Sequence, residues 1–408
     1  MARSRRTQDA PIRTKPWTTG PFHHAAEARA AAKVLAGPAR PLARGPENMK
    51  LRDKLCALYG VRHALPLSSG SAAIHVALAA LDVGPGDEVI VSPLTDYGSV
   101  TGLLQLNATV VFADVVPGSL VMDVHSVAER ITPRTRAIMP IHIAGYPVDM
   151  APLMRLARRH RLPVVEDVAQ SHLLAYRGKY AGAIGEAGCF SLNESKHAKC
   201  GEGGFLLTND RKLVTQAELF SDKCYPRFPG APESPAFPAI NVRMSDLNAA
   251  VAHVQLRRLP GWVARRRKLG QWLDAAAADV PGVGPYVMPK GSEGSYWWWG
   301  FVIEPDRFRG GADGFAEAMR AEGIPCHAGP QRYLPDWELF RRLNADPKAF
   351  RTYRPVGLKR GAYAPERCPV ARSSPSWALS VPITQHNTMA DARDVRAALR
   401  KVADRLRG

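Results

Sequence analysis

The chain has 408 residues, with 55 Lys and Arg against 37 Asp and Glu, and therefore a formal net charge of +18. Hydrophobic residues make up 46% and charged residues 23%, which excludes a disordered or collagen-like chain and leaves ample apolar material for a core. The six cysteines are scattered without a CxxC pair, so we expect neither a zinc ribbon nor a disulfide framework, but reduced thiols in a cytoplasmic protein.

The N-terminal segment 1–45 is rich in Pro, Arg and Ala and predicts an arm that leads into a helix over Ala25–Leu35. Neither a secretory signal nor a stretch of the roughly 20 apolar residues of a membrane helix is found, so we expect no membrane as a partner. Basic residues cluster at both chain ends and could attract nucleic acid, but no aromatic interleaving or zinc-finger spacing accompanies them, and we favour solvated side chains. The clustered residues are Arg3, Arg5, Arg6, Arg13, Arg393, Arg396, Arg400, Lys401, Arg405 and Arg407.

From about residue 51 to residue 210, short β-type runs alternate with helical patterns. This spacing predicts βαβ units and a mostly parallel sheet with helices on both faces, so ligands should bind beyond the carboxyl ends of the strands. The β-type runs are Ala64–Leu67, Glu88–Val91, Thr109–Ala113, Ala137–Ile141, Leu162–Val165, Gly188–Leu192 and Phe205–Thr208. The helical patterns are Ala72–Leu81, Ser99–Leu106, Val124–Arg130 and Met150–His160.

A smaller C-terminal unit follows. Ser245 to Leu259 predicts an amphipathic helix with Ser245 as its N-cap, which Pro260 ends or bends. The further predicted elements are helices over Arg265–Ala278, Ala312–Glu322 and Ala390–Leu406 and a strand over Tyr296–Ile303. We therefore expect an arm over 1–45, a large domain over 46–260 and a small α+β domain over 261–408.

Small residues between the first β-type run and the next helix form a candidate phosphate cradle. In the segment Ser68–Ala73, backbone N–H groups could approach an anion at the positive end of the helix dipole. The alternative is a plain strand-to-helix turn with a serine N-cap.

Two carboxylates, Glu166 and Asp167, directly follow a buried run. Successive side chains of a strand face opposite sides, so only one of the two can face a shared site. A buried carboxylate needs a partner, which could be a metal, an arginine or a protonated ring nitrogen; the alternative is a surface-capping acid.

Lys196 and Lys199 lie in the polar loop between the last two β-type runs. A desolvated lysine loses its proton more easily and becomes a nucleophile toward aldehydes. The residues alone do not choose between the two lysines, and an ordinary surface lysine is the alternative.

A phosphate cradle, a buried carboxylate and a reactive lysine are the groups that pyridoxal phosphate (PLP) requires, because the carboxylate keeps the pyridine nitrogen charged. A metal site built from His142, His172, His197 and Asp167 is the alternative. Its spacings match no standard ligand pattern, so we assign no metal.

The sequence resembles the DegT/DnrJ/EryC1/StrS aminotransferases over about residues 45–405. The resemblance implies PLP fold type I, with a mostly parallel seven-stranded sheet sandwiched by helices, and activity on keto-sugars and keto-cyclitols. The segments that carry it are SSGSAAIHVAL, GDEVIVSPLTD, ITPRTRAIMPIHIAGYPVDM, VVEDVAQS, CFSLNESKHAKCGEGGF and NVRMSDLNAAVAHVQLRRL.

The resemblance also implies residue roles. Lys196 would bind the cofactor aldehyde, Asp167 would pair with the pyridine nitrogen and Gln170 would contact the ring hydroxyl. Gly70, Ser71 and Ser191 would bind the phosphate. The segment Asn241–Arg243 would reach the phosphate of a neighbouring subunit, through Asn241 or else Arg243, so the resemblance implies active sites shared across a homodimer.

One position departs from the family pattern. Many members carry an aromatic residue after the threonine of the PLT segment, and it stacks on the cofactor ring. Here that position is Asp96, followed by Tyr97; the resemblance implies that both stand beside the cofactor, with Asp96 facing either the ring or the substrate.

Substrate contacts are sought in the small domain. His327 and Arg332 lie in a loop that could approach the site. Tyr296 and the run Trp297–Trp299 could line a pocket, although an aromatic strand in a small domain is more often core.

By analogy with the family we expect amino transfer from glutamate or glutamine to a keto-sugar or keto-cyclitol in secondary metabolism such as antibiotic biosynthesis, with Lys196 moving the proton. Two alternatives are another PLP reaction, such as elimination, racemisation or condensation, and a non-catalytic PLP-binding regulator. The many basic residues favour a nucleotide-linked ketone, whereas the Thr95–Asp96 pair favours a cyclitol-like one.

Overall fold

The computed structural model describes residues 10–17, 25–37, 42–43, 45–225, 227, 229–230, 233–330 and 332–407. The predicted arm 1–45 therefore falls partly outside the described residues, and Arg3, Arg5 and Arg6 fall wholly outside them. The helix predicted in the arm is α1 (Ala25–Ala36).

Strands form in all of the predicted β-type runs of the large domain. They are β1 (His63–Leu67), β2 (Glu88–Val91), β3 (Thr109–Phe112), β4 (Thr135–Met139), β5 (Val165–Asp167), β8 (Ala187–Ser191) and β9 (Gly204–Thr208). They pair as one sheet of order β1-β9-β8-β5 and another of order β3-β2-β4. In the described residues, β9 is antiparallel to both β1 and β8, and the other pairs of these two sheets are parallel. Isolated parallel bridges join Ile138 to Val164 and Ile141 to Asp167, where β4 meets β5.

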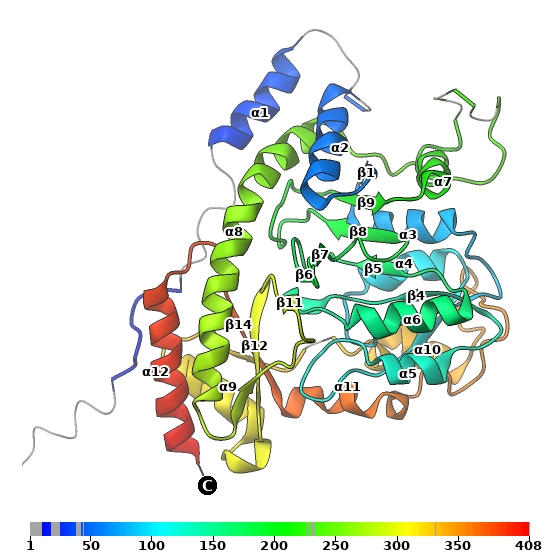
Figure 1. Ribbon diagram of the computed structural model, residues 1–408. Coiled ribbons are helices and arrows are strands. Elements are labelled where there is room, and N and C mark those ends of the chain that lie inside the picture. Colours follow the sequence, from blue (N-terminus) through cyan, green and yellow to red (C-terminus); the bar gives the residue numbers. More distant parts are fainter. Residues whose placement is uncertain are drawn as a thin grey trace, which may run out of the picture.

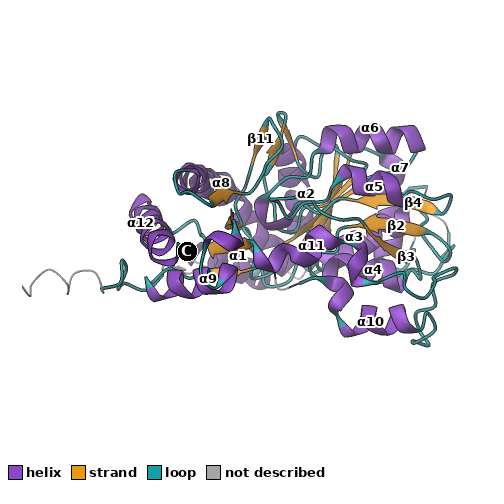
Figure 2. Ribbon diagram, turned by 90° about the horizontal axis from the view of Figure 1, so that it is seen from below, coloured by secondary structure: helices purple, strands orange, loops and turns teal. Residues whose placement is uncertain are grey.

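Helices cover both faces of the strands, as the βαβ rhythm predicts. Figure 2 shows β2, β3 and β4 with α5 (Val124–Arg130) and α6 (Met150–His160) on one side and α4 (Gly98–Gln105) on the other. The helix α3 (Gly70–Ala80) packs against α4 and against α7 (Arg211–Ser221). Every residue of β2 is buried, as expected for a parallel strand covered on both faces.

The longest helix differs from the prediction. The patterns expected on either side of Pro260 form one continuous helix of 33 residues, α8 (Asp246–Ala278), with Pro260 inside it. Ser245 is its N-cap, because its Oγ accepts a hydrogen bond from Asn248 N at 3.2 Å. The domain boundary near residue 260 stays a prediction, but that residue lies within a helix rather than in a linker.

A further, antiparallel sheet lies in the C-terminal part of the chain. Its antiparallel strands follow the order β10-β12-β14-β13. They are β10 (Val283–Pro285), β12 (Trp298–Ile303), β13 (His327–Ala328) and β14 (Ala378–Pro382). The sequence predicted β12 only, because the other strands are short and lack a clear alternation. The predicted helices are α9 (Gly311–Ala321) and α12 (Met389–Leu406).

The remaining elements are short or support the larger ones. Figure 1 shows α1 and α2 beside one half of α8, and α12 beside the other half. A buried apolar cluster joins α2 and α8 to β8 and β9 through Leu55, Leu256 and Phe190. The remaining helices and strands are α2 (Pro46–Tyr59), α10 (Glu338–Ala345), α11 (Pro369–Ser373), β6 (Ala175–Tyr176), β7 (Lys179–Tyr180) and β11 (Ser292–Glu293).

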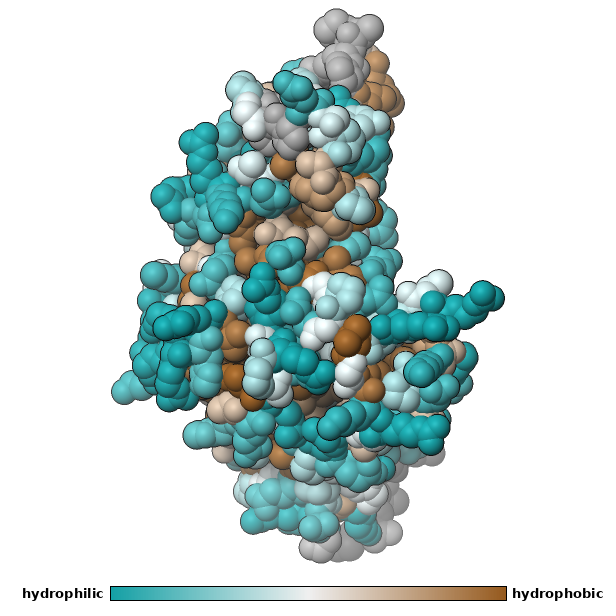
Figure 3. Space-filling model, turned by 90° about the vertical axis from the view of Figure 1, so that its right-hand side faces the viewer, coloured by the Kyte–Doolittle hydropathy of each residue, from teal (hydrophilic) through white to brown (hydrophobic). Residues whose placement is uncertain are grey.

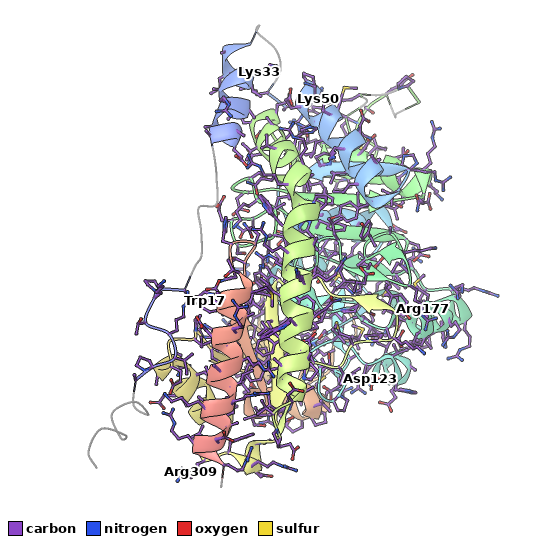
Figure 4. All side chains as sticks on the ribbon, turned by 60° about the vertical axis from the view of Figure 1, so that its left-hand side comes forward. Trp17, Lys33, Lys50, Asp123, Arg177 and Arg309 are labelled. Atoms are coloured by element: carbon purple, nitrogen blue, oxygen red, sulfur yellow. The ribbon has the colours of Figure 1, made fainter. Side chains whose placement is uncertain are left out.

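The N-terminal segment 10–17 packs against the C-terminal unit. Arg13 pairs with Asp391 of α12 at 2.8 Å. Trp17, which Figure 4 shows near α12, donates a hydrogen bond through Nε1 to the Pro382 carbonyl at 2.9 Å. The C-terminal residues Arg396, Lys401, Arg405 and Arg407 also form ion pairs, so part of the clustered positive charge is paired within the fold. In the part of the chain that the structure describes, no helix is long and apolar enough to span a membrane.

Pro260 provides a test of the continuous helix. It is exposed inside α8 and cannot donate the helical hydrogen bond, so Pro260→Ala should raise the free energy of unfolding by about 1–3 kcal/mol in urea unfolding. The matched control is Gly261→Ala, because a Cβ at Gly261 would meet no atom within 4 Å. It restores no hydrogen bond and should add about 1 kcal/mol at most. A less stable Pro260→Ala protein would show that the packing around α8 needs the proline.

Candidate active site

The predicted phosphate cradle lies where α3 begins. Ser69 caps the helix, because its Oγ accepts a hydrogen bond from Ala72 N at 3.0 Å. Gly70 lies against the end of β8, since a Cβ at Gly70 would come within 2.8 Å of the Ser191 Cβ. The Ser71 hydroxyl lies beside Gly98, where a Cβ would be 2.6 Å from it. The fold thus brings Gly70, Ser71 and Ser191 together at a helix N-terminus, where an anion is favoured.

The two adjacent acids occupy separate environments. The strand β5 includes both acids, so it ends two residues later than predicted. The strand continues through Asp167 because Asp167 N donates a hydrogen bond to the Pro140 carbonyl and Asp167 pairs with Cys189 of β8. Glu166 is fully buried and accepts hydrogen bonds from Ile184 N and Gly185 N at 2.9 and 2.7 Å. Asp167, only 3% exposed, faces the other side, as strand alternation predicts.

A relay of hydroxyls orients Asp167. Ser99 of α4 donates a hydrogen bond from Oγ to Asp167 Oδ2 at 2.6 Å, and Ala169 N donates to Oδ1 at 2.9 Å. Thr95 lies 2.7 Å from Ser99 through their hydroxyls. Ser99 was not predicted from the sequence. Thr95 and Ser99 are hydroxyl residues four positions apart across the start of α4, and this spacing is a signal of the contact between them.

Lys196 lies beside Trp297, which also lines the cavity described below. Its Nζ lies 4.7 Å from the centre of the Trp297 ring. Burial lowers the pKa of the Lys196 amine, while the nearby Asp167 carboxylate raises it in part. Burial also lowers the pKa of Lys199, to about 8, but the Lys199 backbone N–H points to Gln255 of α8, at 3.4 Å. The pKa falls for both lysines, and the contact of the Lys196 amine with the cavity-lining Trp297 favours Lys196.

The histidines of the alternative metal site have other partners. His172 Nε2 donates to the Ser191 carbonyl at 2.8 Å, and its Nδ1 lies 3.2 Å from the Tyr59 hydroxyl. Burial lowers the pKa of His172 to about 4, so it is neutral at physiological pH. His197 Nε2 donates to the Ser295 carbonyl at 3.1 Å, and His142 Nε2 lies 3.1 Å from Glu166. These contacts hold the walls of the site.

A cavity of about 240 Å³ lies beside Lys196. Trp297 joins the two, because its ring contacts the Lys196 amine and lines the cavity. Trp298 stacks on Trp297 with ring centres 5.1 Å apart and lines the cavity too, whereas Tyr296 and Trp299 are fully buried and bind Asp274. The aromatic run is thus divided between pocket and core. The cavity is lined by Thr95, Asp96, Leu120, Ile143, Ala144, Gln170, Tyr286, Trp297, Trp298, Gly300, His327, Gly329, Pro330, Arg332 and Ser380.

Three of the predicted site residues meet in the cavity wall. Asp96 Oδ2 forms an ion pair with Arg332, and Asp96 Oδ1 accepts a hydrogen bond from Gly98 N at 2.9 Å. His327 stacks on Trp298 with ring centres 6.4 Å apart. Tyr97 lies apart from them, stacked on Trp337 at 6.2 Å.

The other predicted residues are more dispersed. Gln170 lines the cavity and accepts a hydrogen bond from Ala144 N at 2.9 Å. Asn241 and Arg243 do not line it. Arg243 pairs with Asp222 at 3.0 Å and donates to the exposed Asn241 side chain at 2.9 Å. Their segment runs along the end of β1, where Ser68 N donates to the Val242 carbonyl at 2.8 Å.

These residues fit PLP. The lack of a Cβ at Gly70 lets the N-terminus of α3 approach Ser191, which gathers serine hydroxyls at a helix N-terminus as a phosphate requires. Asp167 is a buried carboxylate suited to a protonated ring nitrogen, and Lys196 is a desolvated amine suited to an aldehyde. No group of metal-ligating residues occurs in the described ranges.

Comparison with known proteins identifies the family of this chain. The DegT/DnrJ/EryC1/StrS aminotransferase family matches residues 23–400. The chain belongs to this family. It is therefore a PLP-dependent aminotransferase, and its α/β fold is that of the fold-type I aminotransferases.

Solved structures show the same fold over nearly the whole chain. DesV of S. venezuelae is 28% identical, with a TM-score of 0.80 and coverage of 96% of this chain and 100% of that one. An aminotransferase of Psychrobacter cryohalolentis is 26% identical, with a TM-score of 0.82 and coverage of 96% and 100%. A 3-amino-5-hydroxybenzoic acid synthase is 24% identical, with a TM-score of 0.83 and coverage of 97% and 100%, which shows the shared fold alone.

Gly70 allows a test of the cradle. Because a Cβ there would press on Ser191, Gly70→Ala should weaken PLP binding by about 10-fold or more, measured by titrating cofactor-free protein with PLP. Gly84→Ala is the control, since a Cβ at Gly84 would meet no atom within 4 Å. Equal PLP affinity in the two variants would contradict the assignment of the cradle.

Proposed function

We propose that this aminotransferase moves an amino group from glutamate or glutamine to a ketone on a sugar or cyclitol ring, in secondary metabolism. The observation that carries the proposal is the position of the Lys196 amine between the buried Asp167 and a small cavity walled by Trp297 and Trp298. Stacked indole rings suit the flat faces of a ring-shaped substrate. Serine, threonine and glutamine side chains in the same wall suit its hydroxyl groups.

Each residue has a chemical role in this proposal. When bound, PLP supplies the electron sink that stabilises a carbanion. The side chain of Asp167, aimed by Ser99, would keep the pyridine nitrogen protonated. Lys196 Nζ would take the proton from the α-carbon of the donor and deliver it to the cofactor carbon that carries the amino group. Its lowered pKa favours the neutral amine that can accept this proton.

The relatives at 25% identity or more support amino transfer. The structure of DesV, at 28% identity, contains a ketimine intermediate. TlmJ of Streptoalloteichus hindustanus is a further aminotransferase of this fold, at 25% identity. Other PLP reactions on the same scaffold would differ in one product, because only amino transfer releases a keto acid in an amount equal to the amino groups moved.

Lys196 tests the proposed chemistry. Lys196→Ala should lose amino transfer by at least about 10³-fold, with no covalent retention of PLP after borohydride reduction. Lys199→Met is the matched control and should keep both properties, because the Lys199 backbone faces α8 rather than the cavity. Keto-acid release in the wild-type protein is measured in parallel. A Lys196→Ala protein with full turnover would refute the role of this amine.

We also propose a homodimer with shared active sites. A surface depression adjoins the cradle, between α3, α4 and the segment 238–242, and Phe220, Ile240 and Val242 give it apolar walls. On the face of the molecule shown in Figure 3, hydrophobic residues likewise appear in patches among hydrophilic ones. The exposed Asn241, or else Arg243, would reach the phosphate of the second subunit from this region.

The bridges between β4 and β5 support one continuous seven-stranded sheet. A cytoplasmic location stays a prediction.

Subunit mixing tests the shared site. Lys196→Ala and Asn241→Ala proteins should each be strongly impaired, yet a refolded equal mixture should recover about a quarter of wild-type activity, because half of its dimers have one intact site. An Arg243→Ala partner repeats the test for the second candidate. If neither mixture recovers activity while the wild-type protein refolds fully, each subunit uses its own residues.

A further inference from the structure

We propose that Arg332 binds the α-carboxylate of the amino donor, and that Asp96 takes its place as the partner of Arg332 when the neutral ketone occupies the cavity. This inference rests on the proposed function and names a subsite within it. One cavity must accept two substrates in turn, an amino acid with a charged carboxylate and a ring ketone without one. An internal carboxylate that exchanges with the carboxylate of the donor would meet both demands.

The charge of the cavity wall points to Arg332. Among the described lining residues it is the only lysine or arginine. The planar fork of a guanidinium can bind a carboxylate through two parallel hydrogen bonds. The donor amine must reach Lys196, and Trp297 links the Lys196 amine to the cavity that Arg332 lines. The donor would therefore lie with its amine toward Lys196 and its carboxylate toward Arg332.

The ion pair between Asp96 and Arg332 can open at low cost, so that Arg332 exchanges Asp96 for the carboxylate of the donor. The two side chains are 47% and 54% exposed, and half-exposed ion pairs contribute little free energy. Asp96 also keeps its second oxygen on Gly98 N, at 2.9 Å, at the start of α4. When Arg332 moves to the donor, the Asp96 carboxylate thus retains a hydrogen bond and contact with water, and its charge is not left isolated.

The backbone holds the two residues side by side. Leu94 and Tyr333 form an antiparallel bridge, and Leu334 N donates to the Pro93 carbonyl at 3.0 Å. Asp96 and Arg332 each lie within a few residues of this bridge, on segments that come from different parts of the sequence. Only the side chains need to move for the exchange, because the distance between the two backbones is fixed.

The test follows the two half-reactions separately by the spectrum of the bound cofactor. Holoenzyme is mixed with L-glutamate, and the donor concentration that gives half the maximal rate is measured. Arg332→Gln should raise this concentration about 10- to 100-fold, since charge-assisted hydrogen bonds to the donor are lost. Asp96→Asn should lower it by about 2- to 5-fold, because the competing carboxylate is removed.

Matched controls separate this exchange from a general loss of charge. Arg136 and Asp82 form another exposed ion pair, away from the cavity lining, so Arg136→Gln and Asp82→Asn should leave the donor concentration unchanged. The α-amide of glutamate lacks the α-carboxylate but keeps the side-chain carboxylate, and its reaction should be insensitive to Arg332→Gln. Glutarate, which has no amine to react, should bind more weakly to the Arg332→Gln holoenzyme in calorimetry.

The outcomes distinguish this inference from the proposed function. If the wild-type protein carries out the donor half-reaction but Arg332→Gln leaves its half-saturating concentration unchanged, the inference is wrong and the proposed function stands. The same holds if Arg332→Gln impairs glutamate and its α-amide equally, or impairs only the ketone half-reaction. If the wild-type holoenzyme releases no keto acid from either glutamate or glutamine, the proposed function fails and the inference fails with it.

Discussion

The site depends on a negative charge that the fold removes from water at the end of β5. Asp167 is almost wholly buried, and its two oxygens accept hydrogen bonds from Ser99 and Ala169. Neutral hydrogen bonds reduce the cost of burying a carboxylate but leave its charge uncompensated. In the proposed function, the protonated ring nitrogen of the cofactor would supply the missing charge. The same field acts on Lys196, whose pKa would fall further through burial without the nearby carboxylate.

The strand geometry keeps this charge separate from the one next to it. Glu166 faces the opposite side, where His142 and the backbone of Ile184 and Gly185 satisfy it. Glu166, with more hydrogen bonds, supports the fold, and Asp167, with fewer, is the acid that we propose for the cofactor. Strand alternation alone predicts that the two acids face different sides, but the assignment of each required the partners that the structure supplies.

Much of the fold could be predicted from local pattern. Alternating apolar runs and helical stretches located the strands of the large domain and the helices between them, because both periods are short-range properties of the chain. The start of α3 followed from Ser69 and Gly70, where N-cap chemistry and small residues coincide, whereas phosphate binding there stays a prediction. Of the two alternatives for Pro260, that it ends the helix was wrong, since an exposed proline is tolerated in a long helix whose stability comes from packing along its other faces.

Contacts between distant segments could not be predicted. Asp96 and Arg332 are joined only because residues near β13 return to the end of β2. The division of the tryptophans depends on Asp274 of α8, which binds Trp299 and Tyr296 and so holds them in the core. Resemblance placed Lys196 in the site, and the structure adds the aromatic ring beside it.

The helix α8 fixes the spacing between the reactive amine and the wall opposite it. Near one end, Gln255 and Asn248 bind the backbone of Lys199 and Cys200, in the loop that carries Lys196. Further along, the buried Arg266 donates to the Trp297 carbonyl at 3.1 Å. The loop that carries Lys196 and the backbone of Trp297 are thus both anchored to α8. A shift of the C-terminal unit that left this helix intact could alter access to the site without separating Lys196 from Trp297.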